Sequence, residues 1–296
     1  MNHNKIVIGT WALSGDYGYI DLYDINEILN YSYNHHGFKE YDTAPSYGNG
    51  FAEFCLGNFF YGVEDVLINT KIGNVPFKGK NFDILSLKES FEQSLVRLKR
   101  DNINILYLHN PREDVNYELV LNYMKALKNE GRIRYIGLSK AKDIDYSIWE
   151  SEFDVIQDDY NLLRMPKIDN NYHVFMARSP LASGLLSGSI KNDTIFKKGD
   201  SRNEWLKGKR LEYLLEQIEG IKNIITSYDI SLSTVAKRYV LHKSFINKVI
   251  FGVKNKNHIT ELLLDMENPL PHVLETMLYF GYTNNFGVKY NHKLNY

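Results

Sequence analysis

Short runs of apolar residues recur along the chain, and stretches with the residue pattern of helices lie between them. The runs show no polar alternation, which is typical of parallel strands that are buried on both faces. One run, residues 38–42, is interrupted by Lys39 and Glu40, but its position between a helical stretch and a turn favours a strand. The other seven are residues 6–8, 66–68, 103–108, 133–138, 155–156, 174–176 and 249–251.

Eight strands that alternate with helices in one series predict an α/β fold, a single-domain (β/α)8 TIM barrel over residues 1–296. No Pro- or Ser-rich linker divides the series into two domains. The clearest expected helices are residues 24–36, which begin at Asp24, residues 86–99, and residues 117–129, which end before Gly131. Ser86 and Glu89 have the spacing of a capping box and are expected to open the second of these helices.

The longest gap between expected strands runs from about residue 181 to residue 247. It contains a polar stretch, residues 188–210, that is longer than an ordinary connection between a strand and a helix. In a barrel this long loop is expected at the catalytic face, where it could fold over a ligand. A solvated loop without a function is the alternative.

Four side chains that handle protons lie at or just after three successive expected strands: Asp42, Tyr47, Lys71 and His109. In a parallel barrel the carboxyl ends of the strands open onto one face, so these side chains are expected to converge. A nearby lysine ammonium lowers the pKa of a tyrosine, and an aspartate keeps the ammonium charged. A histidine could orient a carbonyl oxygen, on which negative charge develops during reduction. Each residue alone could instead be a cap, a surface charge or part of a turn.

The composition excludes several functional classes. The chain has 296 residues and a net charge of −1, which gives no general attraction to nucleic acid or to an anionic membrane surface. A single cysteine, Cys55, excludes an internal disulfide, and neither a signal peptide nor an apolar stretch of about 18 residues is evident. We therefore expect a cytoplasmic protein. The nine histidines show no metal-binding spacing, so no metal site is predicted.

The order of several short motifs extends this interpretation. Gly9-Thr10-Trp11 follows the first expected strand, Asn69-Thr70-Lys71 the third, and Leu108-His109-Asn110-Pro111 the fourth. Further motifs are Ile136-Gly137-Leu138-Ser139, Gln157 with Tyr160-Asn161, and residues 179–188. In these motifs and their order the sequence resembles the aldo-keto reductase family over nearly its whole length. The resemblance implies a barrel that binds NADPH, with NADH possible, and reduces an aldehyde or ketone. It also implies that Asp42, Tyr47, Lys71 and His109 are the catalytic residues.

The resemblance also implies a set of cofactor-binding residues. Ser139 and Gln157 correspond to positions that hold the nicotinamide carboxamide, and residues 179–185 and 252–254 to segments along the pyrophosphate and adenosine. Trp11 would line the substrate pocket, or it is an ordinary core residue. The full set is Gly9, Thr10, Trp11, Asp42, Ser139, Lys140, Gln157, Arg178, Ser179, Pro180, Leu181, Ser183, Gly184, Gly252, Val253, Lys254, His258 and Glu261.

Some of these positions depart from the family pattern. Lys140 replaces an asparagine, and Arg178 stands where many members have a tyrosine that stacks on the nicotinamide ring. His258 and Leu262 replace an arginine for the 2′-phosphate and an asparagine for adenine, whereas Glu261 is kept. Lys254 or Lys256 could supply the lost positive charge, so the choice between NADPH and NADH stays open.

The leading hypothesis is therefore an NAD(P)H-dependent reductase of a small-molecule carbonyl compound, in which Tyr47 donates the proton. Arg178, Lys140 and the loop cations suggest an anionic substrate or a keto-sugar derivative; solvated surface charge is the alternative. The loop cations are Lys197, Lys198, Lys207, Lys209 and Arg210. A regulatory or redox-sensing module that binds the cofactor without significant turnover is the competing function. A monomer or weak oligomer is expected from the family.

Overall fold

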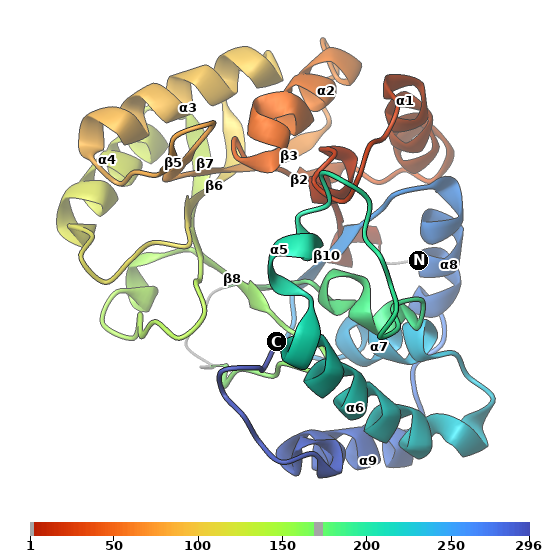
Figure 1. The fold of residues 1–296 in the computed structure, drawn as a ribbon. Coiled ribbons are helices and arrows are strands. Elements are labelled where there is room, and N and C mark those ends of the chain that lie inside the picture. The colour runs from red at the N-terminus through yellow and green to blue at the C-terminus, as the bar shows by residue number, and fades with distance from the viewer. Residues whose placement is uncertain (1–2, 169–173) are drawn as a thin grey trace.

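A closed barrel of parallel strands forms the centre of the molecule in the computed structural model, which describes residues 3–168 and 174–296 (Figure 1). The predicted domain also includes residues 1–2 and 169–173, which lie outside the described part. Around the barrel the strand order is β1-β10-β9-β8-β7-β6-β3-β2, which confirms the predicted TIM barrel. The strands are β1 (Ile6–Gly9), β2 (Glu40–Asp42), β3 (Leu67–Ile72), β6 (Ile103–His109), β7 (Ile133–Ser139), β8 (Val155–Asp159), β9 (Val174–Arg178) and β10 (Lys248–Gly252).

Side chains from β1, β6, β8, β9 and β10 fill the inside of the barrel. Val7, Ile105, Tyr107, Val155, Met176 and Ile250 form one buried cluster, separate from the larger core between strands and helices. Tyr107 is fully buried, and its hydroxyl donates to Met176 Sδ at 3.3 Å. A Cβ atom on Gly137 would lie 2.3 Å from Tyr107 Cδ1. Glycine at position 137 therefore makes room for the Tyr107 ring.

Helices surround the barrel, and two of them begin earlier than predicted. The first ends in a π-helical turn, η3 (Tyr31–His35), and the carboxylate of Asp21, not Asp24, caps its first turn by accepting from Tyr23 N at 2.7 Å. The third begins after Asp83, whose carboxylate accepts from Leu85 N at 2.9 Å, so the predicted capping box at Ser86 lies inside the helix. The helices are α1 (Leu22–Asn30), α2 (Phe51–Phe59), α3 (Ile84–Leu98), α4 (Tyr117–Asn129), α5 (Arg202–Trp205), α6 (Gly208–Ile225), α7 (Leu232–Leu241), α8 (Lys256–Met266) and α9 (His272–Thr283).

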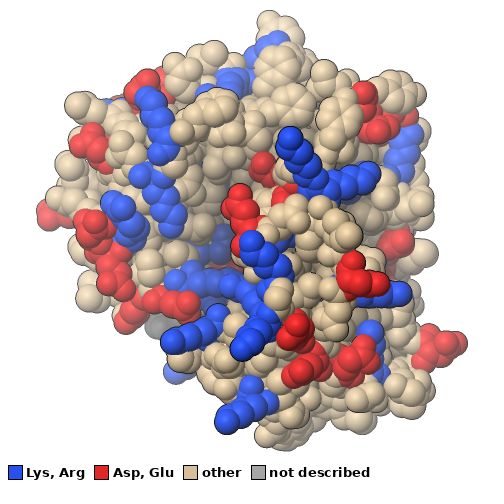
Figure 2. Space-filling view, viewed as in Figure 1, with Lys and Arg blue, Asp and Glu red and all other residues tan. Residues whose placement is uncertain are grey.

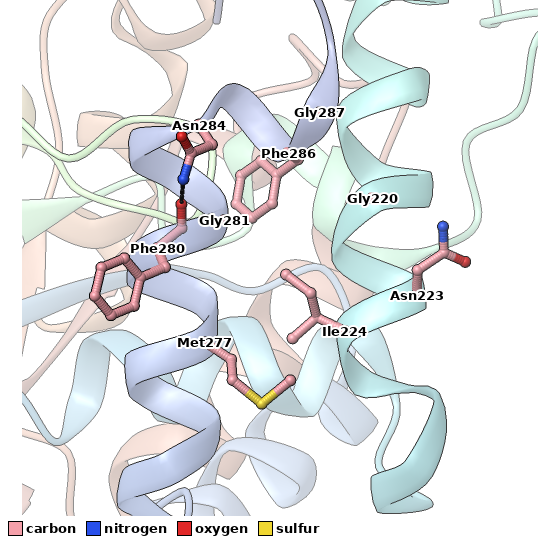
Figure 3. Close-up of a pocket in the computed structure, with 9 residues that line it drawn as sticks. All are labelled: Gly220, Asn223, Ile224, Met277, Phe280, Gly281, Asn284, Phe286 and Gly287. Carbon is pink, nitrogen blue, oxygen red and sulfur yellow. Dashed lines mark hydrogen bonds between the residues drawn. The ribbon is translucent and has the colours of Figure 1, made fainter.

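Two features outside the barrel, a hairpin and a groove, were not expected from the sequence. A short hairpin of β4 (Asn74–Val75) and β5 (Gly79–Lys80) follows β3. Between α6 and α9 lies an apolar groove of about 470 Å³ (Figure 3). It is lined by Gly220, Asn223, Ile224, Met277, Phe280, Gly281, Asn284, Phe286 and Gly287, and includes none of the predicted catalytic or cofactor-binding residues.

The segment between β9 and β10 reaches back to the start of the chain. It contains η6 (Ala182–Ser187), α5, α6, η7 (Thr226–Tyr228) and α7. Before α5, Asp200 forms an isolated bridge with Tyr17, and Ser201 N donates to Asp16 O at 2.8 Å. This part of the long segment is thereby tied to the loop that follows β1, at the carboxyl end of that strand. None of the described helices is long and apolar enough to cross a membrane.

Candidate active site

Lys71 connects the predicted catalytic residues at the carboxyl ends of β2 and β3. Its Nζ donates to Asp42 Oδ1 at 2.5 Å, to Thr43 O at 2.8 Å and to the Tyr47 hydroxyl at 3.1 Å. The side chains of Lys71 and Asp42 are 0% and 4% exposed. The structure therefore brings the predicted lysine, aspartate and tyrosine into direct contact.

The pKa shift of Lys71 agrees with expectation, whereas that of Tyr47 does not. Burial lowers the pKa of Lys71, but the Asp42 carboxylate and the Tyr47 hydroxyl outweigh it and leave the pKa raised, so the ammonium stays charged. We expected Lys71 to lower the pKa of Tyr47. Instead burial raises it by more than the Lys71 charge lowers it. Tyr47 is therefore a protonated phenol that lies beside a fixed positive charge.

His109 is the last residue of β6, the strand next to β3, and its ring faces the ring of Tyr47. The two rings meet edge to face with centroids 6.2 Å apart. Burial, followed by the charges of Lys71 and Arg178, lowers the pKa of His109 well below its ordinary value, so the imidazole is neutral. Its Nδ1 is buried and has no hydrogen-bond partner among the described residues. One ring nitrogen of this histidine is thus left without a partner among the described residues.

Trp11, which follows β1, lies beside Tyr47. The two rings are nearly parallel, with centroids 5.8 Å apart and 17° between their planes. Trp11 Nε1 donates to Asp16 Oδ2 at 2.9 Å, and the same oxygen accepts from Gly48 N at 3.1 Å. Since Trp11 is only half-buried, it forms a wall beside Tyr47 and is not a core residue. Gly9 and Thr10 precede it at the end of β1, where Thr10 Oγ1 donates to Asp42 O at 3.0 Å.

A row of polar side chains crosses the barrel from His109 to β8. His109, Ser139 and Gln157 are register partners on neighbouring strands. Ser139 Oγ donates to Gln157 Oε1 at 2.9 Å, and Gln157 Nε2 donates to Asp42 Oδ2 at 3.0 Å. The predicted carboxamide-binding residues are therefore continuous with the catalytic group.

Arg178 and Lys140, which depart from the family pattern, are both held in ion pairs. Arg178 Nε donates to Asp159 Oδ1 at 3.1 Å, while its two terminal nitrogens donate to Ser139 Oγ at 3.1 Å and Lys140 O at 2.8 Å. Lys140 Nζ lies 2.5 Å from Glu150 Oε1. Their charges are compensated by two carboxylates, Glu150 and Asp159, which were not expected from the sequence to be their partners.

The segment after β9 has the irregular backbone of a ligand-binding turn. Ser179, Ala182 and Ser183 have φ values of 56°, 48° and 54°, which are uncommon for residues with a side chain. The predicted residues Pro180, Leu181 and Gly184 belong to the same turn. Ser183 Oγ accepts from the Tyr17 hydroxyl at 3.2 Å, and Ser183 O accepts from Arg202 Nη1 at 3.2 Å. The turn is therefore fixed to the loop after β1 and to α5.

The residues at the end of β10 lie on the same face but point to several partners. Lys254 Nζ, after Gly252 and Val253, donates to Tyr17 O at 2.5 Å, and its backbone N donates to His258 Nδ1 at 3.3 Å. Glu261 pairs with Lys237 at 3.2 Å, and Lys256 with Glu27 at 2.6 Å. Lys254 thus contacts Tyr17, whose hydroxyl contacts the predicted cofactor turn, whereas Lys256 is directed to α1.

Sequence reasoning missed two acidic residues of this face. Asp159 holds Arg178, and Asp16 links Trp11 to the backbone next to Tyr47. Asp159 ends β8, so the rule that identified Asp42 at a strand end would also have found it. In the described part of the chain no group of His, Cys, Asp or Glu side chains is arranged to hold a metal ion.

Comparison with known proteins identifies the family. Residues 5–272 match the model of the aldo/keto reductase family. The NADH-specific methylglyoxal reductase of Escherichia coli is 26% identical over 287 residues, covering 87% of this chain and 88% of that one. A probable voltage-gated potassium channel subunit beta of Arabidopsis thaliana is 25% identical over 286 residues, with 87% and 86% covered. The solved structure of a glycerol dehydrogenase from Gluconobacter oxydans shares the fold, with a TM-score of 0.78, 20% identity and 99% of both chains covered. The chain therefore belongs to the aldo/keto reductase family and is an NAD(P)H-dependent oxidoreductase.

Proposed function

We propose that this protein reduces an aldehyde or ketone to an alcohol and that Tyr47 donates the proton to the carbonyl oxygen. One observation carries the proposal: the buried Lys71 ammonium lies 3.1 Å from the Tyr47 hydroxyl and 2.5 Å from Asp42. When Tyr47 gives up its proton, the phenolate forms beside a cation that is already in place. Preorganised charge of this kind stabilises the transition state without reorganisation.

The other residues of the site have distinct roles in this proposal. Asp42 keeps Lys71 charged in a region that water does not reach. A neutral His109 donates one N–H to the carbonyl oxygen, which holds the carbonyl carbon in position and stabilises the charge that develops on the oxygen. Trp11 stands beside Tyr47 and limits the space for the substrate. Each role rests on the contacts of this chain's own side chains.

The cofactor, when bound, supplies the hydride that is transferred to the carbonyl carbon. Ser139 and Gln157 would hold its carboxamide, and the turn of residues 179–184 and the end of β10 would hold its phosphates. The unpartnered, buried His109 Nδ1 lies one strand from Ser139 and fits a polar group placed there. NADPH is the proposed cofactor, because Lys254 follows the end of β10; NADH remains the alternative, as in the Escherichia coli relative.

A calorimetric titration with NADPH and with NADH tests the cofactor, and a panel of carbonyl compounds tests the reaction. Tight binding of either nucleotide with carbonyl-dependent oxidation of NAD(P)H supports the proposal. Tyr47→Phe is expected to retain nucleotide binding and lose turnover. Failure to bind either nucleotide would contradict the proposal.

A cofactor-binding regulatory subunit is the second candidate, because two plant relatives carry the name of a potassium channel subunit beta. The same Tyr47→Phe variant separates the two functions. A regulatory module would hold the nucleotide, turn over no carbonyl compound and be unaffected by loss of the hydroxyl. The contact between Lys71 and Tyr47 favours the enzyme, since binding alone does not require it. A cytoplasmic location and a monomer or weak oligomer remain predictions.

The class of substrate is the finer part of the proposal. An anionic or keto-sugar substrate was suggested by Arg178, Lys140 and the loop cations. Arg178 and Lys140 are neutralised by Asp159 and Glu150. Of the loop cations, Lys197, Lys198, Lys207 and Lys209 are exposed, and only Arg210 is half-buried. Recognition of an anion would therefore need residues other than Arg178, Lys140 and the four exposed lysines.

A further inference from the structure

Three basic residues gather beside the active site on the β7–β9 side of the barrel. Lys142 follows β7 by three residues, Arg164 follows β8 by five, and Arg210 lies in the first turn of α6. We call these three residues the basic rim. They come together because the carboxyl ends of β7 and β8 open onto the same face, and Arg210 reaches them from the long segment after β9. Figure 2 shows Lys and Arg side chains gathered around the hollow of this face, near the C terminus and α5 in Figure 1.

The residues of the basic rim keep donors without acceptors. Arg164 Nε and Arg210 Nε are buried and have no hydrogen-bond partner among the described residues. Lys142 Nζ lies 4.2 Å from the centre of the Tyr296 ring, with no carboxylate of the described residues at ion-pairing distance. A buried donor without an acceptor costs free energy, and more so when it is charged.

The nearby carboxylates neutralise the basic rim only in part. Asp159 is engaged with Arg178 at 3.1 Å, and the closest approach of Asp158 to Arg164 is 3.9 Å. The pKa of Lys142 is lowered to about 8, chiefly by burial; Asp159 raises it, and Arg164, Arg210 and Arg178 lower it. An anion beside Lys142 would favour its charged form.

The basic rim is connected to the reacting group through Arg178. The guanidinium of Arg178 lies between Asp159, on the side of the rim, and Ser139 and Asn110, beside His109. The segments expected to hold the phosphates of the cofactor, residues 179–185 and 252–254, contribute none of the unpaired donors. Arg178 therefore links the residues beside His109 to Asp159, whose charge also acts on Lys142.

We propose that the basic rim binds a phosphate or carboxylate group at the far end of the carbonyl substrate. The proposal rests on the proposed reductase function and adds the class of substrate. Arg164 and Arg210 present guanidinium N–H groups, which suit the planar or tetrahedral array of anion oxygens, and Lys142 adds a compact positive charge. The substrates favoured by this site are small anionic aldehydes or ketones, such as sugar phosphates.

Matched substrates test the proposal in steady-state kinetics with the full chain. Glyceraldehyde and glyceraldehyde 3-phosphate differ only in the anionic group. Wild-type protein is expected to have the higher kcat/KM for the phosphate. Lys142→Met should raise KM for the phosphate about 10- to 100-fold and leave glyceraldehyde unchanged. Lys142→Arg should restore most of the preference, and Lys198→Met, which removes an exposed lysine of the same face, should have no effect.

Three results of these kinetics would overturn the proposal. The first is an equal kcat/KM of the wild type for the two aldehydes. The second is an equal loss for both aldehydes in Lys142→Met. The third is a weaker affinity of Lys142→Met for NADPH, measured by calorimetry, with an unchanged ratio between the aldehydes. That result would show that Lys142 binds a phosphate of the cofactor and not the anionic group of the substrate.

A titration with inorganic phosphate, followed by phosphorus NMR, separates the anion site from the reductase function. Saturable phosphate binding that is lost in Lys142→Met supports the basic rim even if no carbonyl compound is reduced. Reduction of glyceraldehyde without such binding overturns the basic rim and leaves the proposed reductase function intact. The titration depends on no turnover, so the two failures are distinguishable.

Discussion

Lys71 Nζ lies 2.5 Å from Asp42 Oδ1, and neither side chain is more than 4% exposed. The free energy needed to remove two charges from water often exceeds what their attraction returns, so a buried pair is weak evidence for a role in stability. The third partner supplies the reason for the pair. The same Nζ donates to the Tyr47 hydroxyl, so the pair holds a positive charge beside the group that is the proton donor in the proposed reaction.

Replacement of Lys71 by methionine is expected to damage both catalysis and stability. The phenolate of Tyr47 would form without a cation beside it, and kcat should fall about 10²- to 10⁴-fold. Asp42 would be left buried without its partner, which should lower the free energy of unfolding by about 3–5 kcal/mol. Steady-state kinetics and urea unfolding measure the two effects. The double variant Asp42→Asn/Lys71→Met should recover stability but no activity, and a wild-type kcat in Lys71→Met would contradict the assigned role.

Tyr47→Phe removes only the hydroxyl and is expected to abolish carbonyl reduction while nucleotide binding is retained. Because burial raises the pKa of Tyr47, the wild-type hydroxyl stays protonated through neutral pH. Deprotonation of Tyr47 should therefore cause no fall in the rate of reduction at any pH below about 10, the ordinary pKa of tyrosine. Pre-steady-state oxidation of NAD(P)H reports the chemical step directly. Tyr107→Phe is the matched control, since that hydroxyl lies inside the barrel and contacts Met176.

His109 is expected to make the fold less stable at acid pH. Its pKa is lowered well below the ordinary value of 6.5 by burial and by neighbouring cations, so the folded protein keeps it neutral while the unfolded chain binds a proton. The stability associated with the neutral ring is fully present above pH 6.5 and is lost as the pH falls below it, by at most about 1.4 kcal/mol per pH unit.

Thermal or urea unfolding between pH 5 and pH 8 measures this dependence. His109→Gln cannot titrate, so its stability should vary less across this range than that of the wild type. Equal slopes for the two proteins would show that the pKa of His109 does not differ between the folded and the unfolded chain.

The barrel was predictable because strands buried on both faces are recognisable as apolar runs. The contact of Asp42, Tyr47 and Lys71 was predictable because strand ends of a parallel barrel converge. The first residue of a helix was harder to predict where two residues could each cap it. Asp83 and Ser86 are both good caps, and only the backbone shows that Asp83, in extended conformation, is the residue outside the helix. The sign of the pKa shift of Tyr47 depends on burial, which a sequence pattern does not quantify.

The charged residues illustrate a second limit. Lys140 and Arg178 looked like free cations because their partners, Glu150 and Asp159, meet them only after folding. Arg210 was named among the loop cations, but its grouping with Lys142 and Arg164 in the basic rim was missed for the opposite reason. Its members come from separate parts of the chain, and what distinguishes them is the absence of acceptors around their donors.

Gly137→Ala tests the packing inside the barrel. The added Cβ would lie 2.3 Å from Tyr107 Cδ1 and 3.0 Å from Ile105 Cγ2, and Tyr107 has no space to move. Overpacking of this kind should lower the free energy of unfolding by about 1–3 kcal/mol. Gly252→Ala is the control, because its Cβ would meet nothing closer than Ala12 Cβ at 4.0 Å. A variant at position 137 as stable as the control would mean that the interior relaxes around the methyl group.

The pKa of Lys142 gives the basic rim a measurable pH dependence. Lys142 faces Asp159, Arg164, Arg178, Arg210 and the ring of Tyr296, and its pKa is lowered to about 8, chiefly by burial. A phosphate monoester is a dianion above about pH 6, so only the lysine changes charge around pH 8. Below pH 8 the ammonium is present, and kcat/KM for glyceraldehyde 3-phosphate is expected to be high. As the pH rises through 8 the charge is lost, and kcat/KM for the phosphate should fall toward that for glyceraldehyde. Lys142→Arg keeps its charge and should remove this fall, whereas a persisting fall would assign it to another group.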